Sequence, residues 1–475
     1  MKFKMHVMKL WNYLTSKLSV FFPIMDQVLA WLRKYKNFYF LLGFFAPEKK
    51  YPETEKKYRY GIIICARNEH LVIGNLIDSI YAQTYDQDKM DIFVVADNCT
   101  DDTAQICRDK GCIVYERFDQ VHARKGYAME FLFDRIIEDY GIDSYDGYIV
   151  FDADNLLNPT FVEELNKAFD TGAGVAVGYR NTKNFDRNVI SAGYGIHFYQ
   201  SVVAYHRPRA WLGISTHIAG TGFVIASRLL KDGWHYTCLT EDSQLTLNCA
   251  AQGERIAYCE AAEFFDEQPY EIKVMMRQRI RWIRGRLYSF FSTLPKTTKG
   301  LFSIFGKQSL IVEEEEGKRK NIFLRGWRKT LSCYDMIVYA FPNSTYYGLR
   351  IILFPILAKI IGVILALFVG EKMGVGDGAG ASKPVWMTAW VMLTTHWFTI
   401  VKTELSGFLI ILRERKRIRC SKLKLFFYTL VFPWFDAIGA PLAIIALFSK
   451  SQWKPIKHDE ALTLEDLDIH TKKEN

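Results

Sequence analysis

The sequence lacks the short motifs that mark several common classes of nucleotide-binding and metal-binding protein. It has no GxGxxG, which argues against a Rossmann dinucleotide site, and no GxxxxGK[ST], which argues against a P-loop. Its nine cysteines form no CxxC pair and show no zinc-ligand spacing, so we expect reduced thiols facing the cytosol. The N-terminus lacks the short apolar core and small-residue cleavage site of a signal peptide, and we find no internal repeat.

The composition is that of a globular protein with additional apolar segments. The 475 residues are 49% hydrophobic and 24% charged, which excludes a disordered chain and allows a large folded domain. The net charge is +9, but much of the positive charge flanks apolar stretches near the C-terminus. That placement predicts a membrane as partner and argues against nucleic acid.

Three apolar stretches lie in the last third of the chain, at 351–369, 385–412 and 425–448. Each is long enough for the roughly 20 residues that a bilayer requires. The loop RERKRIRCSKLK (413–424) has seven basic residues and one acid, which predicts a cytosolic loop. We therefore expect a multi-pass protein of the cell membrane with about three spans and a cytosolic catalytic part. The side of the C-terminus stays open, because one segment could be re-entrant.

Residues 60–300 alternate short apolar runs with helix-length stretches. Strands are predicted at 61–66, 91–97, 112–116, 147–152, 173–179, 223–227 and 255–260, and helices at 70–83, 101–110 and 122–139. This alternation predicts an α/β domain with a mostly parallel sheet, in which ligands bind at the carboxyl ends of the strands. We divide the chain into five parts. Residues 1–55 form an amphipathic segment that lies at a membrane interface or packs on the protein, and residues 56–300 form the catalytic domain. They are followed by a linker (301–348), a membrane region (349–449) and a polar tail (450–475).

Two aspartates end the strand in YIVFDADN (148–155). Residues two apart on a strand point to the same side, so Asp152 and Asp154 could reach one object. Two neighbouring carboxylates repel each other unless a cation lies between them, and Mg²⁺ or Mn²⁺ prefers such oxygen ligands. Another strand ends in Asp97, for which we expect a ligand role, although turn chemistry would also place an aspartate there.

Polar residues of two helical stretches complete the pattern. Thr240-Glu241-Asp242 opens one helix, where Thr or Asp could also be a plain N-cap. In MMRQRIRWIRGR (275–286), Gln278, Arg281 and Trp282 share one helical face. An arginine can clamp a diphosphate, and a tryptophan offers a flat surface to a sugar ring.

Together, Asp97, Asp152-x-Asp154, Thr240-Glu241-Asp242 and Gln278-x-x-Arg281-Trp282 resemble the D, DxD, TED and QxxRW series of family 2 glycosyltransferases. The resemblance covers about residues 58–295. In this part the chain is similar to bacterial members of the family that have transmembrane helices after the catalytic domain. It implies a GT-A fold, a nucleoside-diphosphate sugar donor and inversion at the anomeric carbon. It also implies Mg²⁺ or Mn²⁺ at Asp154 with Asp152, and Asp97 at the nucleobase or ribose.

The resemblance implies roles for the remaining residues of the predicted site. Asn68 and Glu69 lie near the nucleotide in this interpretation, Lys125 contacts it, and Asp242, next to Glu241, is the base that activates the acceptor hydroxyl. Gln278, Arg281 and Trp282 hold the pyrophosphate and the acceptor sugar.

The predicted function is sugar transfer, most simply from a UDP-sugar, to a lipid-linked or polysaccharide acceptor in envelope or exopolysaccharide synthesis. One alternative is a processive synthase that secretes its product through an oligomeric channel or with a channel partner. An alternative of another class is an inactive nucleotide sensor or transport subunit. A nucleotidyltransferase would need a glycine-rich basic loop after the first strand, where this chain has ARNEH.

Overall fold

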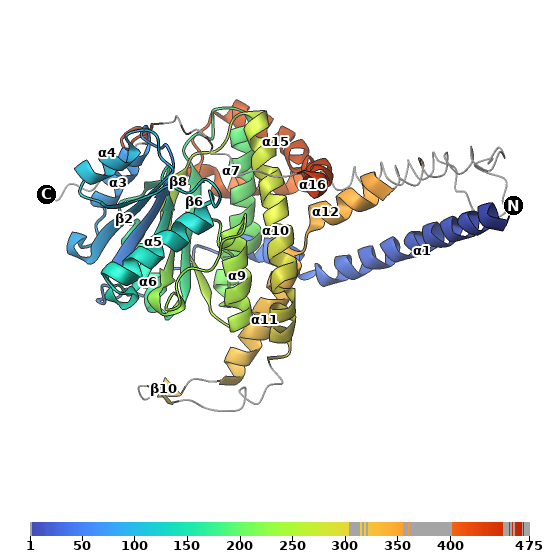
Figure 1. Ribbon diagram of the computed structural model, residues 1–475, viewed down its shortest axis with the longest axis horizontal. Coiled ribbons are helices and arrows are strands. Elements are labelled where there is room, and N and C mark those ends of the chain that lie inside the picture. The colour runs from blue at the N-terminus through green and yellow to red at the C-terminus, as the bar shows by residue number, and fades with distance from the viewer. Residues whose placement is uncertain are drawn as a thin grey trace.

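The computed structural model describes residues 2–303, 314–315, 318–319, 322–354, 360, 401–449, 456, 458, 461–467 and 469. Its centre is an α/β domain built on one eight-stranded sheet (Figure 1). The strands of this sheet are β1 (Tyr60–Ala66), β2 (Met90–Asp97), β3 (Ile113–Arg117), β4 (Gly147–Asp152), β5 (Leu156–Leu157), β6 (Val175–Thr182), β7 (Phe223–Ala226) and β8 (Ile256–Asp266).

The sheet has the order β3-β2-β1-β4-β7-β6-β8-β5. The first four strands run parallel, as the sequence predicts. The prediction of a mostly parallel sheet is confirmed, because β6 and β8 also pair parallel with each other. The exceptions are β7, which pairs antiparallel with both β4 and β6, and β5, which pairs antiparallel with β8. The parallel half matters most for the site, since its register places Asp97 and Asp152 at one edge.

Helices cover both faces of the sheet. On one face α3 (Ile73–Tyr81) and α6 (Phe161–Asp170) contribute Leu76 and Leu165 to a buried apolar cluster. On the other face α5 (Lys125–Asp139) and α9 (Glu241–Gln252) contribute Phe133 and Leu245. The remaining helices of the domain are α4 (Thr103–Asp109), α7 (Val189–Ser201), α8 (Arg207–Leu212) and α10 (Ile272–Leu301). The three helices predicted between the early strands are confirmed with shorter bounds.

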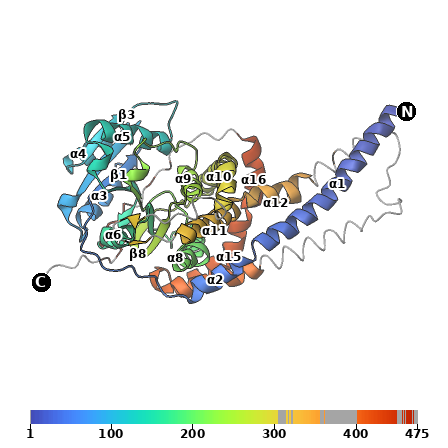
Figure 2. The same ribbon diagram turned by 90° about the horizontal axis from the view of Figure 1, so that it is seen from below.

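The terminal segments form a second layer against this domain. They comprise α1 (Lys2–Leu32), α2 (Tyr35–Phe45), α11 (Ile322–Ala340), α12 (Asn343–Gly348), α15 (Lys422–Ala437) and α16 (Gly439–Phe448). A short hairpin of β9 (Glu314–Glu315) and β10 (Lys318–Arg319) lies within the predicted charged loop. Helix α1 projects away from the body, with Phe21, Ile24 and Trp31 exposed (Figures 1 and 2).

Within the described residues, one helical run is long and apolar enough to cross a membrane, Lys422–Phe448. It coincides with the third predicted span. The predicted spans at 351–369 and 385–412 lie largely outside the described residues, as does most of the tail 450–475. The number of spans therefore stays a prediction.

Candidate active site

A single cavity of about 300 Å³ lies at the carboxyl edge of the parallel strands, between the sheet and helices α9 and α10. Residues from widely separated parts of the sequence line it. Of the eleven site residues that the sequence predicts, ten are among the lining residues: Glu69, Asp97, Lys125, Asp152, Asp154, Glu241, Asp242, Gln278, Arg281 and Trp282. The motifs that the sequence analysis assigned to one site therefore line one cavity.

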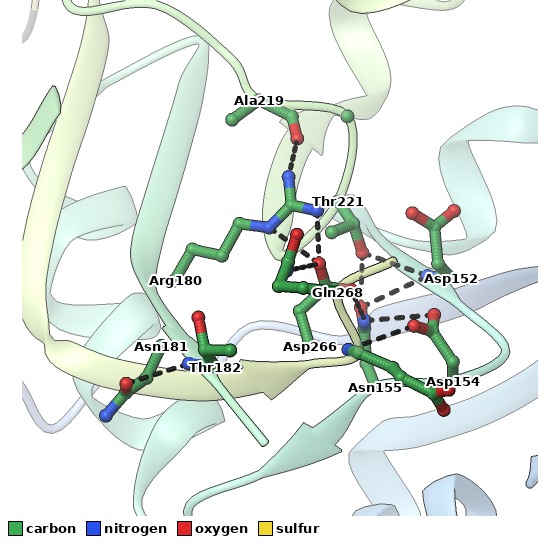
Figure 3. Close-up of polar contacts among 12 residues, drawn as sticks. Asp152, Asp154, Asn155, Arg180, Asn181, Thr182, Ala219, Thr221, Asp266 and Gln268 are labelled. Atoms are coloured by element: carbon green, nitrogen blue, oxygen red, sulfur yellow. Dashed lines mark hydrogen bonds and ion pairs between the residues drawn. The ribbon is translucent and has the colours of Figure 1, made fainter. Parts of the chain in front are cut away.

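Three carboxylates meet at the floor of the cavity (Figure 3). Asp152 is the last residue of β4, Asp154 lies in the turn after it, and Asp266 ends β8. Each offers one oxygen, and these oxygens lie within 4.8 Å of one another. An all-oxygen set of this size suits a hard divalent cation such as Mg²⁺ or Mn²⁺. The sequence did not single out Asp266, because it lies 112 residues after Asp154 in a strand that joins the site only through β-pairing.

A polar network holds these carboxylates in place (Figure 3). The Asn155 amide donates to Asp266 Oδ1 at 2.8 Å, and the Asp152 backbone N–H donates to Thr221 Oγ1 at 2.9 Å. Arg180 donates from Nε to Asp266 Oδ2 at 2.9 Å. Burial raises the pKa of Asp266 to about 6, with Asp154 adding to the shift while Arg180 opposes it. Negative charge at this floor is thus only partly compensated by the protein.

Lys125 begins α5 and forms an ion pair with Asp152. Its ammonium also donates to the backbone oxygen of Gly220 at 2.8 Å. Burial alone would raise the pKa of Asp152, but the adjacent Lys125 ammonium holds that pKa below its usual value. Lys125 therefore keeps Asp152 ionised. Its ammonium also places a positive charge at the cavity wall, where a bound phosphate could replace the Asp152 carboxylate as its partner.

Asp97 is buried at the end of β2 and is paired within the protein. Its Oδ1 accepts from Arg117 Nη1 at 2.6 Å and from the Asn98 amide at 2.9 Å. Burial raises the pKa of Asp97 even though Arg117 opposes the shift. Sequence reasoning missed Arg117, although it ends β3 directly opposite Asp97 in the parallel register.

Asn68 is the exception among the predicted site residues, since it is exposed and does not line the cavity. Its backbone has a left-handed φ of 58°, and its side-chain oxygen accepts from the backbone N–H of Thr100 at 2.8 Å. Asn68 therefore ties the loop after β1 to the loop after β2. Its neighbour Glu69 does line the cavity.

Glu241 and Asp242 occupy the first turn of α9 and face the cavity. Burial and the neighbouring Asp242 raise the pKa of Glu241 to about 7. Burial also raises the pKa of Asp242, while Ser243, Lys125 and Arg286 oppose that shift. The capping alternative for Thr240 is not what the structure shows: its side chain caps no N–H of the helix and lies 3.3 Å from Ser289 Oγ.

Helix α10 supplies the opposite wall with Gln278, Arg281 and Trp282. The Trp282 ring packs edge-on against Tyr194 with ring centroids 5.7 Å apart, which fixes its orientation. Gln278 Oε1 is buried and has no hydrogen-bond partner within the described part of the chain. A buried acceptor without a partner is costly, so a bound group that donates to it would be stabilised.

His458, from the C-terminal tail, also lines the cavity. Its Nδ1 lies 3.0 and 3.1 Å from the two carboxylate oxygens of Glu69, and its Nε2 lies 3.9 Å from Asp154 Oδ2. Burial would lower the pKa of His458, but Asp154 and Glu69 raise it to about 10. Nothing in the sequence distinguished this histidine, which is one of two in the polar tail.

Comparisons with known proteins match the part of the chain that contains most of the cavity residues. Residues 58–285 match the family model described as glycosyltransferase like family 2. The probable glycosyltransferase YdaM of Bacillus subtilis (strain 168) is 28% identical over 244 residues, which are 48% of this chain and 56% of that protein. The chain thus spans little more than half the length of this curated relative.

Two solved structures are among those that resemble this chain. The mannosyltransferase PcManGT from Pyrobaculum calidifontis, in complex with GDP-Man and Mn²⁺, has a TM-score of 0.49 at 15% identity, over 90% of this chain and 99% of that one. Glucosyl-3-phosphoglycerate synthase from Mycobacterium tuberculosis, in complex with Mn²⁺, UDP and phosphoglyceric acid, has a TM-score of 0.34 at 17% identity, over 50% and 78%. Residues 58–285 of this chain are therefore similar to glycosyltransferase-like family 2 domains.

Proposed function

We propose that this protein is a divalent-cation-dependent, inverting glycosyltransferase that takes its sugar from a nucleoside-diphosphate donor. The observation that carries the proposal is the single cavity in which Asp97, Asp154, Asp242 and Trp282 meet. Four motifs that are far apart in sequence would share one cavity by chance only rarely. The family match over residues 58–285 supports the same reaction class.

The donor end of the cavity is the acidic floor. Asp152, Asp154 and Asp266 would hold Mg²⁺ or Mn²⁺, and His458 lies beside Asp154 as an ion-pair partner. The ion, when bound, neutralises the charge that develops on the departing diphosphate. Lys125 and Arg281 add fixed positive charge beside that group, and Asp97 with Glu69 faces the nucleoside.

The acceptor end is formed by α9 and α10. Asp242 accepts the proton of the attacking acceptor hydroxyl, because its buried carboxylate has a raised pKa and lies on the wall of the cavity. The Glu241 carboxyl, next to it, adds to the negative potential of this wall. Trp282, held by Tyr194, presents its ring to the acceptor sugar, and Gln278 supplies an acceptor oxygen that has no partner among the residues the structure describes.

We further propose a membrane location with the catalytic domain on the cytosolic side, in a bacterial envelope or exopolysaccharide pathway with a lipid-linked or glycan acceptor. The basic loop 413–424 supports this placement, since Glu414 of that loop pairs with Arg207 at 2.7 Å and accepts from Tyr179 at 3.0 Å inside the catalytic domain. Loop and domain thus share one side of any bilayer, and the loop's positive charge favours the cytosol.

The experiment is a donor panel. Detergent-purified protein is incubated with Mn²⁺ and each of several UDP- and GDP-sugars, and release of the nucleoside diphosphate is measured with mass analysis of the product. We expect one donor to be used in preference, with one sugar or a short series added. A ladder of long products would instead favour the processive synthase, and no turnover with any donor would favour the inactive sensor.

A further inference from the structure

The apolar run Lys422–Phe448, formed by α15 and α16, has two different faces. One face is packed against the protein through Leu425, Tyr428, Thr429, Phe432, Pro433, Leu442, Ala443 and Ala446. The other face leaves large apolar side chains exposed: Leu423, Phe426, Phe427, Leu430, Trp434, Ile445, Leu447 and Phe448. A contiguous apolar surface of this kind indicates contact with a lipid or protein partner.

The run is attached to the catalytic domain at its start and in its middle. At the start, Lys424 pairs with Asp186 at 3.1 Å. In the middle, the Phe435 ring packs on Tyr194 with centroids 5.2 Å apart, and its backbone oxygen accepts from Arg279 Nη1 at 2.5 Å. Tyr194 is the same residue that holds Trp282, so α15 lies beside the cavity wall rather than away from it.

The chain returns to the catalytic domain almost at once after this run. Helix α16 ends at Phe448, whereas Ile456 and His458 already line the cavity. Farther on, Leu467 is buried against Leu156 and Phe265 beside the sheet. The tail is therefore docked on the same domain that holds the start of the run.

The length of the connection decides the topology. Only residues 450–455, KSQWKP, separate Ser449 from Ile456, and a fully extended chain covers about 25 Å over that stretch. The hydrocarbon core of a bilayer is about 30 Å thick, and extended polar backbone is not tolerated in it. If 422–448 crossed the bilayer, the tail could not reach Glu69 and Asp154.

We propose that the run 422–448 does not cross the membrane but lies along its cytosolic surface, with its exposed apolar face in the lipid and its other face on the catalytic domain. The occupant of the exposed face is an anionic lipid surface, because the flanking loop 413–424 carries seven basic residues. In Figures 1 and 2, α15 and α16 lie on the side of the body from which α1 projects. The inference rests on the membrane attachment proposed above but not on the reaction.

Depth measurements along the run test this topology. In the full chain with its nine native cysteines replaced, single cysteines are introduced at exposed residues as Leu423→Cys, Phe427→Cys, Trp434→Cys and Phe448→Cys, and carry nitroxide labels in vesicles of phosphatidylcholine and phosphatidylglycerol. A surface-lying helix predicts similar, shallow depths at all four sites. A crossing helix predicts a maximum depth in the middle and a return to the opposite surface at 448, and that profile would overturn the proposal. Lys416→Cys, in the exposed basic loop, is the aqueous control.

Accessibility from one side gives an independent test. Lys416→Cys and Glu465→Cys are exposed positions in the loop and the tail, and both are treated with a membrane-impermeant maleimide in inverted vesicles. We expect both to react, and protection of position 465 alone would refute the topology. If no label contacts lipid, the proposal that this run lies in the membrane surface falls. Sugar transfer, measured on the same samples, separates that outcome from a failure of the proposed reaction.

Discussion

Asp242 is the residue on which the proposed chemistry depends most. It is placed in the first turn of α9, where its Oδ1 accepts from the Ser243 backbone N–H at 2.7 Å. Asp242→Asn keeps this size and shape but cannot take a proton. We expect transfer to fall about 10²–10⁴-fold, the usual contribution of general base catalysis, with donor affinity nearly unchanged. The measurement is turnover together with calorimetric donor binding. Normal turnover in the variant would show that Asp242 is not the base.

Arg286 gives a prediction about pH. Burial raises the pKa of Asp242, and the positive charge of Arg286 counteracts that shift. The base must be ionised, so activity is lost as pH falls through this pKa. Arg286→Gln removes a stabilising charge and should move the acid limb of kcat/KM to higher pH.

The matched control for this variant is Lys273→Gln, which removes an exposed cation from the same helix at a position that does not line the cavity. Its acid limb should coincide with that of the unmodified protein. Equal shifts in the two variants would mean that the effect comes from net charge alone and not from Arg286 acting on Asp242.

At the scale of elements, a buried ion network joins the loop before α15 to the sheet. Arg207 pairs with Glu260 of β8 and with Glu414 of the loop, and all three side chains are at most 6% exposed. Removing one partner of a buried pair leaves the others uncompensated and typically costs about 3–5 kcal/mol. We therefore expect Arg207→Met to lower the melting temperature markedly in a thermal unfolding assay.

Arg419→Met is the comparison for this change, because Arg419 is an exposed arginine of the same basic loop. A surface substitution of this type usually changes stability by no more than about 0.5 kcal/mol. If the two variants melt at the same temperature, the network does not anchor the loop to the domain.

The sequence predicted elements well where each element carries its own signal. Strand 147–152 is a short apolar run that ends in aspartate, and the structure has β4 at those residues. The antiparallel position of β7 between β4 and β6 was not predicted, because a run of four apolar residues does not indicate the direction of a strand or which strands it pairs with. Pairing of strands far apart in sequence is a property of the whole fold.

The same limit explains the site residues that the sequence did not reveal. Asp152 and Asp154 could be found because they lie two residues apart at the end of one apolar run, which is a local signal, although β4 ends at Asp152 and Asp154 lies in the turn after it. Asp266 and Arg117 lie at the site because their strands pair with neighbouring strands in a particular register. His458 lies there because the C-terminal tail returns to the cavity. The resemblance placed Asn68 near the nucleotide together with Glu69, whereas the structure has Asn68 outside the cavity lining, where its left-handed backbone and its bond to Thr100 make it a contact between two loops.

On the scale of the whole molecule, the central claim is that one cation and one nucleoside diphosphate share the cavity floor. The direct test is the affinity for the nucleoside diphosphate of the accepted donor, measured by calorimetry with Mn²⁺ and with EDTA, in the unmodified protein and in Asp154→Asn. We expect Mn²⁺ to tighten binding at least about tenfold, or about 1.4 kcal/mol, in the unmodified protein and to have little effect in Asp154→Asn. Affinity that is the same with and without Mn²⁺, or a metal effect that survives in Asp154→Asn, would contradict the account.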